Sequence, residues 1–458
     1  MIKKLKKLVL SPKRYFYDYF RKKLGFRKYF VTDKIRLLDS VNHQKWIKLL
    51  FSHPYLYFYY KLNKRLRNPS YPILVDYRIE NIHENGMGGG KRTVLAVELE
   101  RNNIIYFTDP RIVQDAADNK DPNLAGAILR CNFLGSGNKV FLNAGVKVGR
   151  DISICFRGST NTFLIDNNCN LSGGLIELHG NANKIEFGPH NSIESKAHII
   201  FRGNNNTLHT GNACCFMRGS RITYLHDDNY VYIGPDTKIS EFAKVGLNGS
   251  NSLCYICGGS KLNLTDLRLN SDSIFFYGFG STVYPYDGKG FYFAGQSKNI
   301  LIGSDCMFGN NLFIRNFTGH SMYDGQSKKR ISNPESIIIG DHVWINMGSR
   351  IFRGSKIKSG TVIGANSFVT NKEIPEKCVV VGAPAKVIRE NILWGREAPP
   401  DNAKTRELSL YDTYKRPEKL PTYIGWDRLT KINAIEPSMS AAEKLNRVHN
   451  ILEKLDGC

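Results

Sequence analysis

One histidine stands in a sequence context that suits proton transfer. His320 lies in the segment GHSMYD, in a stretch that interrupts a run of regularly spaced apolar residues between Ile314 and Ile337. An imidazole with a pKa of about 6.5 can take the proton of a hydroxyl group at neutral pH, so that the hydroxyl oxygen attacks a carbonyl carbon. Asp324 is the candidate for holding the second ring nitrogen. These residues predict general-base chemistry on a loop.

Other residues with chemical potential are interpreted as structural. His342 competes with His320 for the role of base, but it lies in a run expected to be a strand. Cys254 and Cys257 form a single CxxC without a second pair or a nearby histidine at metal-ligand spacing. A place in an apolar core is favoured for them over zinc or redox chemistry. No constellation of metal ligands is visible, so no metal is expected.

The elements that must position His320 repeat every six residues. Aliphatic residues recur at this spacing without a break at Ile339, Ile345, Ile351, Ile357, Ile363 and Val369. The same spacing is kept upstream by Ile302, Phe308 and Ile314. Three six-residue sides close a triangular coil with the aliphatic residue inside, whereas a helix of about 3.6 residues per turn cannot hold this phase on one face. The sequence therefore predicts a mainly β protein with a parallel β-helix over residues 299–390.

A longer period precedes the six-residue one. A short β-rich run opens every 22 or 23 residues at Asn138, Asn161, Asn183, Asn206, Asn229 and Asn251, and Ser273 and Asn299 continue the series. A fixed period is typical of stacked coils that cover each other's apolar faces. Residues 131–298 are thus predicted to form a β-solenoid of unspecified handedness. Its Asn side chains are expected to hydrogen-bond in a ladder and to have no catalytic role.

Positive charge is concentrated near the N-terminus. The formal charge is +23, and residues 1–68 hold 19 Lys or Arg against three Asp. Basic residues interleaved with aromatic ones are typical of a helix lying on an anionic membrane surface. Docking on an anionic polymer or a protein partner, or a plain solvated helix, are the alternatives. No membrane span and no secretory signal are predicted, and a cytoplasmic protein, peripheral on the inner face of the cytoplasmic membrane, is expected.

Two further segments flank the predicted solenoid. Residues 69–130 contain strand-like runs such as TVLAVELE and are predicted to form a mixed α/β connecting domain. Residues 391–458 form a C-terminal extension with a predicted helix from Ser438 to Leu455. That helix is expected to cover the open end of the solenoid or a neighbouring subunit. Pro375 and Pro384 are expected to end the solenoid.

Four motifs in a fixed order carry a family resemblance. GHSMYD, IGDHVWI, IGANSFVT and VGAPAKVIRE span residues 319–390, which is 72 residues or about one sixth of the chain. This combination resembles the core of the hexapeptide acetyltransferases, closest to bacterial O-acetyltransferases that modify sugars and capsular or lipopolysaccharide chains. The resemblance implies a left-handed parallel β-helix, a homotrimer with sites between subunits, acetyl-CoA as donor, and His320 as the catalytic base.

The same resemblance implies a path for the donor. The residues expected to bind acetyl-CoA are Trp344, Met347, Ala365, Thr370, Lys372 and Arg389. Trp344 would line the acetyl or acceptor site, with a packing role as the alternative, and the two cations would reach the phosphates. Asn346 replaces the usual Gly of the motif. One extra residue before Pro375 leaves Asn371 as an alternative to Lys372.

The predicted function is O-acetylation of a capsular or other surface polysaccharide, by direct attack of the acceptor hydroxyl on acetyl-CoA without a covalent intermediate. The basic N-terminus resembles, more weakly, those of bacterial capsule-assembly enzymes, which implies an association with such a complex. An acetyltransferase acting on a small nucleotide-sugar or amino-sugar is the second enzyme hypothesis. A sugar-binding β-solenoid scaffold is the non-enzymatic alternative. No nucleic-acid partner is expected.

Overall fold

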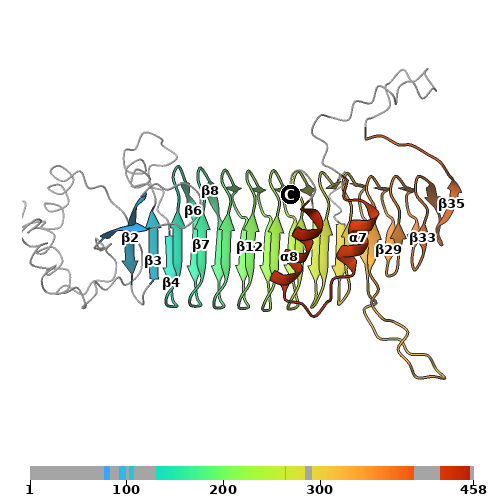
Figure 1. Cartoon of the computed structure of the whole chain (residues 1–458), viewed down its shortest axis with the longest axis horizontal. Helices are drawn as coiled ribbons and strands as arrows, with labels where there is room; N and C mark the ends of the chain where they lie inside the picture. The colour runs from blue at the N-terminus through green and yellow to red at the C-terminus, as the bar shows by residue number, and fades with distance from the viewer. Residues whose placement is uncertain are drawn as a thin grey trace, which may run out of the picture.

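The chain forms a three-sided parallel β-helix whose coils stack along one long axis (Figure 1). This computed structural model describes residues 77–82, 92–99, 103–107, 130–263, 265–283, 291–396 and 423–453. Successive coils place their strands side by side in parallel register, so each coil extends three faces at once. We call these faces A, B and C, in the order in which each coil visits them.

Face A is a 14-stranded sheet. Its strands are β1 (Tyr77–Ile82), β2 (Arg92–Leu99), β3 (Asn103–Phe107), β5 (Lys139–Leu142), β7 (Thr162–Ile165), β9 (Lys184–Phe187), β12 (Thr207–Thr210), β15 (Tyr230–Ile233), β18 (Leu253–Ile256), β21 (Ile274–Tyr277), β24 (Ile300–Ile302), β27 (Ile337–Ile339), β30 (Lys356–Ile357) and β33 (Glu373–Ile374).

Faces B and C are joined through two long strands, β6 (Lys147–Phe156) and β8 (Asn170–Leu178), which begin on face B and end on face C. Face B continues with β10 (Ser192–Ile193), β13 (Cys215–Phe216), β16 (Lys238–Ile239), β19 (Lys261–Leu262), β22 (Thr282–Val283), β25 (Met307–Phe308), β28 (Trp344–Ile345), β31 (Val362–Ile363), β34 (Val379–Val381) and β35 (Lys386–Arg389). Face C contains β4 (Arg130–Phe133), β11 (His198–Phe201), β14 (Arg221–Tyr224), β17 (Lys244–Leu247), β20 (Thr265–Leu269), β23 (Phe291–Gly295), β26 (Phe313–Arg315), β29 (Arg350–Phe352) and β32 (Phe368–Val369).

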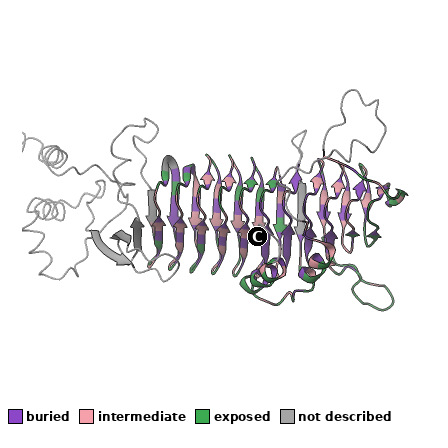
Figure 2. Cartoon of the chain, turned by 45° about the horizontal axis from the view of Figure 1, so that its top comes forward, coloured by how far each residue is buried: buried purple, intermediate pink, exposed green. Residues whose placement is uncertain are grey.

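In the coils from β5 onward, alternate strand residues with described side chains are buried and form one continuous apolar core (Figure 2). Strand side chains alternate between the two sides of a sheet, so in a strand such as β9 the burial follows the same alternation. The six predicted aliphatic residues from Ile339 to Val369 are at most 1% exposed. Ile302, Phe308 and Ile314 are fully buried as well. The predicted mainly β parallel solenoid with inward aliphatic residues is confirmed.

The predicted asparagine ladder is present, with one correction. The Asn206 side-chain oxygen accepts a hydrogen bond from the backbone N–H of Asn229 at 2.9 Å, one coil away. The next position is occupied by Ser252, whose backbone N–H donates to Asn229 at 2.9 Å. The prediction of Asn251 at this position was therefore wrong by one residue. Asn251 has a positive φ of 61° instead, in the left-handed region that Asn tolerates at a corner.

The two ends of the described solenoid depart from parallel pairing. Of the predicted connecting segment, the described residues include β1, β2 and β3, and β1–β2 and β2–β3 pair antiparallel. At the other end, β34 still pairs parallel with β31 after Pro375, and β35 then runs back antiparallel to β34. Parallel pairing thus continues past Pro375 and ends at β34, just before Pro384. The basic segment 1–68 lies outside the described residues.

Two helices cover the outer side of face A, α7 (Trp426–Asn433) and α8 (Ala441–Leu452) (Figures 1 and 2). Helix α8 begins at a capping box formed by Ser440 and Glu443. Its expected position over the open end was wrong, because its apolar side packs along the flank of the solenoid. The strands beneath lose their alternating burial: every residue of β18, β21, β24 and β27 is buried.

This helix pair is fastened by apolar burial. The outward residues of face A under the helices are apolar, and Tyr255 and Phe276 stack with their rings 5.4 Å apart. From the helices, Leu429 and Val448 are fully buried against them. Complete burial of one such aliphatic side chain contributes about 1.5–3 kcal/mol. Among the described helices, none is long and apolar enough to cross a membrane.

Candidate active site

His320 lies on a long loop that extends away from the solenoid. The loop leaves face C after β26 and returns to face A at β27, so it starts from the corner between these faces (Figure 1). It closes on itself through an antiparallel bridge between Tyr323 and Arg330. The backbone N–H of Ile331 donates to the carbonyl of Met322 at 2.9 Å. The solenoid thus supplies two fixed ends, and the loop's own bonds shape its tip.

The His320 side chain is exposed, and its ring has no hydrogen bond to another described residue. Its backbone carbonyl accepts from the Thr318 hydroxyl at 2.8 Å. The Asp324 carboxylate does not hold the ring, because it accepts from the backbone N–H groups of Gln326 and Ser327 at 3.1 and 2.6 Å. The hydrogen bonds from Ser327 lower the pKa of Asp324. Asp324 therefore shapes the turn that follows His320.

An arginine at the base of this loop was not singled out from the sequence. The guanidinium of Arg315 lies over the Phe317 ring, 4.2 Å from its centroid. A Cβ at Gly319 would lie only 3.0 Å from an Arg315 terminal nitrogen, so the cation sits against the residue that precedes His320. The Arg315 Nε atom is buried and has no hydrogen-bond partner among the described residues. A positive charge is therefore available next to the candidate base.

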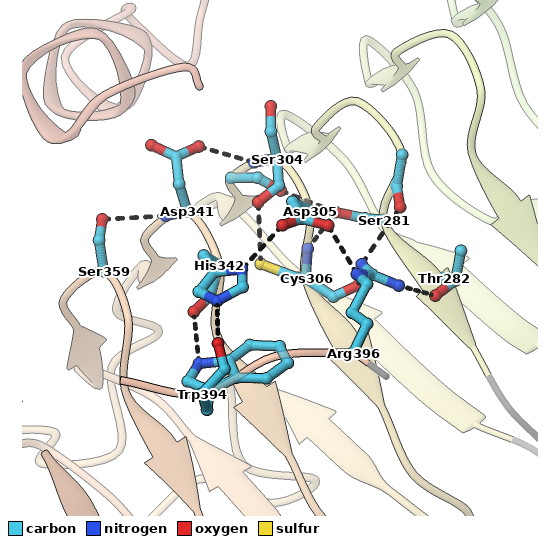
Figure 3. A network of polar contacts seen from close by, with 12 residues as sticks. Ser281, Thr282, Ser304, Asp305, Cys306, Asp341, His342, Ser359, Trp394 and Arg396 are labelled. Carbon is cyan, nitrogen blue, oxygen red and sulfur yellow. Dashed lines mark hydrogen bonds and ion pairs between the residues drawn. The ribbon is translucent and has the colours of Figure 1, made fainter. Parts of the chain in front are cut away.

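His342 has a contrasting environment in which both ring nitrogens are engaged (Figure 3). Nδ1 lies 2.7 Å from an Asp305 carboxylate oxygen, and Nε2 lies 2.9 Å from the Trp394 carbonyl oxygen. Both partners only accept hydrogen bonds, so both contacts are satisfied when both nitrogens of the ring carry a proton. The ring also stacks on Trp394 with centroids 4.0 Å apart. His342 lies at a corner with φ 53°, not within a strand as expected.

Asp305 joins His342 to Arg396 (Figure 3). The Arg396 Nε donates to Asp305 at 2.6 Å, and its terminal nitrogens donate to the Thr282 hydroxyl and the Cys306 carbonyl at 2.8 Å each. Burial raises the pKa of Asp305, but the hydrogen bond from His342 and the charge of Arg396 outweigh it and leave the pKa below its usual range. We call this set, Asp305, His342, Trp394 and Arg396, the clamp. It fastens the chain after β35 across face B.

Three of the predicted donor-site residues lie on face B or at its corner with face C. Trp344 points outward from β28, half-buried, with its ring 5.7 Å from that of Trp394. Met347 follows at the corner with 53% of its surface exposed. Ala365 is exposed at the same corner one coil on, where the backbone N–H of Asn366 donates to the Met347 carbonyl at 2.9 Å.

The remaining predicted donor-site residues are placed elsewhere. Thr370 and Lys372 follow β32 at the corner between faces C and A, the corner from which the His320 loop also leaves. The Lys372 ammonium donates to the Ala385 carbonyl at 3.0 Å. Arg389 is exposed at the end of β35, beside β34 on face B. A single chain therefore divides the predicted residues between two sides of the solenoid.

The CxxC cysteines lie in two different cores. Cys254 belongs to the interior of the solenoid, and Cys257 to the apolar layer between face A and the helices. Burial raises the pKa of Cys254 above its usual range, which leaves a protonated thiol at neutral pH. The described part of the chain contains no group of three or more His, Cys, Asp or Glu side chains placed to hold a metal ion.

The chain is similar to proteins named for acetyl transfer to a polysaccharide. It is 30% identical over 196 residues to a polysialic acid O-acetyltransferase of Neisseria meningitidis, covering 43% of this chain and 88% of that protein. It is 36% identical over 109 residues to a polysialic acid O-acetyltransferase of Escherichia coli O1:K1, covering 24% of this chain and 35% of that protein. The chain thus spans about a third of the length of the second relative.

A solved structure of the polysialic acid O-acetyltransferase OatWY aligns with 47% of this chain and 99% of its own. The two are 26% identical over the alignment, with a TM-score of 0.40. No family model matches the sequence.

Proposed function

Because the chain belongs to the hexapeptide-repeat acetyltransferase family, we propose that it transfers the acetyl group of acetyl-CoA to hydroxyl groups of a surface polysaccharide. Two relatives named polysialic acid O-acetyltransferase support an acceptor of this class. The observation that carries the proposal is the contrast between the two histidines of the acetyltransferase motifs, His320 and His342. His320 presents a ring free of bonds to described residues, whereas both nitrogens of His342 are engaged.

The proposed reaction proceeds by direct attack. A His320 ring nitrogen takes the proton of the acceptor hydroxyl as its oxygen forms a bond to the thioester carbonyl carbon. Backbone N–H groups stabilise the negative charge that develops on the carbonyl oxygen. The carbon–sulfur bond then breaks, the sulfur takes the proton from the His320 imidazolium, and an O-acetyl ester and free CoA are formed. The scheme requires neither a covalent intermediate nor a metal.

Acetyl-CoA enters this scheme as a substrate bound along the solenoid. Trp344, Met347 and Ala365 would border the acetyl group and the pantetheine arm at the corner between faces B and C. Arg389 and Lys372 would approach the phosphate groups, where fixed cations suit phosphate oxygens. Lys372 keeps two of its three N–H donors for this purpose, since one is given to the Ala385 carbonyl.

We further propose that the complete site forms between copies of the chain in a homotrimer. Within one chain, the His320 loop leaves the corner between faces C and A, whereas Trp344 faces outward on face B. The loop exposes Met322, Tyr323 and Ile331 at 48%, 61% and 51%. Apolar side chains on a projecting loop are suited to contact a second copy, which would bring His320 to the Trp344 side of its neighbour.

The test is transfer of labelled acetyl groups from acetyl-CoA to a panel of polysaccharides, nucleotide-sugars and amino-sugars. We expect label in polysaccharide, released by mild base as expected of an ester. Labelling of small sugars alone would contradict the polymer acceptor and favour the second enzyme hypothesis. If folded protein transfers acetyl groups to none of the hydroxyl acceptors, the proposed O-acetyltransferase activity is contradicted.

For the basic segment 1–68 we propose association with an anionic membrane surface, with the rest of the protein on its cytoplasmic side. Residues 1–68 carry a net charge of +16, out of +23 for the whole chain, and this concentration of charge supports the proposal. Removal of residues 1–68 should release the protein from sedimented membranes while soluble acceptors are still acetylated. Continued sedimentation of the shortened protein would contradict the proposal.

A further inference from the structure

Face C carries a column of basic residues in the coils upstream of the site. His198, Arg221 and Lys244 occupy the same position in β11, β14 and β17, where the parallel register pairs each with the next. Neighbouring strands lie about 4.8 Å apart, so these side chains are stacked at close range. Arg202, directly after β11, adds another cation. We call these four residues the basic column.

Contacts within the described part of the chain do not explain why these basic residues are grouped on face C. Arg202, Arg221 and Lys244 are exposed, and none forms an ion pair within the part of the chain that the structure describes. An Arg221 terminal nitrogen lies 3.0 Å from His198 Nδ1. Burial and the charge of Arg221 both lower the pKa of His198, so at neutral pH the imidazole is an uncharged acceptor. Like charges on adjacent strands repel each other, which destabilises the bare face.

Among the side chains that the structure describes on face C, the acidic ones are already engaged. Glu177 lies 3.1 Å from the His179 ring, and Asp266 forms an ion pair with Arg268 at 2.9 Å. The corner toward face B adds no net charge, since its charged residues in these coils are Glu194, Lys196, Arg218 and Glu241. At the corner toward face A, Arg202 follows β11 directly, and Asp227 and Asp228 lie one coil on. An anion is therefore favoured on the strands of face C and beside Arg202, and disfavoured beside Asp227 and Asp228.

The basic column leads along one face to the candidate active site. Face C continues from β11 through β14, β17, β20 and β23 to β26, which ends at Arg315. Five steps of about 4.8 Å make this path about 24 Å long. The Arg315 guanidinium lies against Gly319, the residue before His320. Only an extended ligand can contact both the column and the loop, because a single sugar is too short.

We propose that face C is a binding track for an acidic polysaccharide, which the basic column holds and which reaches His320 beside Arg315. This inference rests on the proposed function, since the track serves acetyl transfer to a polymer. Carboxylate groups spaced along the polymer match the exposed cations in charge. Arg315 pairs through its terminal guanidinium nitrogens with the carboxylate nearest the reacting hydroxyl, beside Gly319 and His320.

The test compares two variants that lose the same charge on different faces. Arg202→Gln/Arg221→Gln/Lys244→Gln removes three cations from face C. Lys139→Gln/Lys238→Gln/Lys261→Gln is the matched control, because these lysines are exposed on faces A and B. The probes are long-chain polysialic acid, a sialic acid monomer and neutral dextran. Binding and acetylation are measured at low and high salt, and the mass of the assembly is checked for each variant.

The face C variant is expected to bind long-chain polysialic acid about tenfold or more weakly at low salt, with a smaller difference at high salt. Its acetylation of the monomer should be unchanged. Three results would each overturn the track. The control variant could lose as much polysialic acid binding as the face C variant, or the wild type could bind dextran as tightly as polysialic acid. The third is a changed assembly mass in the face C variant. If no hydroxyl acceptor is acetylated while polysialic acid binding still depends on face C, the proposed function fails and the track stands.

Discussion

The His320 loop and the solenoid that carries it satisfy their polar groups in opposite ways. On the loop, the His320 ring is exposed and without a bond to a described residue. In the solenoid, His342 is bonded at both nitrogens and stacked on Trp394. In the asparagine ladder, the side-chain oxygen of the fully buried Asn206 accepts from the backbone N–H of Asn229, while its amide nitrogen has no partner among the described residues. The difference teaches that two histidines within the same motifs can differ in whether a ring nitrogen is available to accept a proton.

The same contrast separates changes that affect turnover from changes that affect folding. A loop residue with few bonds to the rest of the chain can be replaced at little cost in stability. A buried charged or polar group cannot, because its former partners lose their hydrogen bonds in a place that water does not reach.

The largest effect is expected from His320→Ala. The rate of acetyl transfer should fall by about 10²–10⁴-fold, because the hydroxyl proton loses its acceptor. The unfolding midpoint and the assembly mass should stay at wild-type values, since the ring is exposed. Turnover in labelled acetyl-CoA assays and denaturant unfolding check the two parts. Turnover close to that of the wild type would remove His320 from the mechanism.

The clamp should show the reverse pattern. Asp305→Ala leaves His342 and Arg396 without their shared carboxylate, and the side chain that is lost was only 4% exposed. We expect the free energy of unfolding to fall by about 3–5 kcal/mol. Urea unfolding measures this change, with Asp324→Ala as the control, since that carboxylate is solvated on the loop. Equal destabilisation by both substitutions would contradict the distinction between loop and clamp.

A smaller loss of stability is expected from Asn206→Ala in the ladder. The backbone N–H of Asn229 would lose its acceptor inside the solenoid, which costs about 1–3 kcal/mol. Asn212→Ala is the matched control, because Asn212 is exposed at a corner and lies outside the ladder positions. Acetyl transfer by the folded fraction should be unchanged in both variants. If Asn206→Ala is as stable as Asn212→Ala, the ladder hydrogen bond contributes nothing to the free energy of unfolding.

The smallest effect is expected from mild acid. The pKa of Asp305 lies below that of an unfolded aspartate, so the unfolded chain takes up a proton more readily as the pH falls. This contribution to stability is complete above a pH of about 4 and is lost as the pH falls through the depressed pKa. The free energies of unfolding of the wild type and of Asp305→Asn should therefore become more similar as the pH falls. A constant difference between them down to pH 3 would contradict this assignment.

Much of the fold could be predicted because it repeats. The inward position of Ile345 or Ile363 follows from a six-residue phase, and the ladder from an Asn at a fixed position in each longer coil. The error at Asn251 arose because Ser252 fills the ladder position with a different residue type. The outward apolar residues Tyr255 and Phe276 were a signal that face A is covered. The predicted helix alone did not say which surface it covers.

The sequence by itself determined the solenoid, its apolar interior and the motifs that include His320 and Trp344. Those features depend on residues that recur at a fixed spacing along the chain and therefore occupy the same position in successive coils. Tertiary structure decided that Trp394 and Arg396 fasten His342, that Arg315 lies against Gly319, and that His320 and Trp344 leave different faces of one chain. These contacts depend on where a corner turns and how side chains meet across it, which no repeat period specifies.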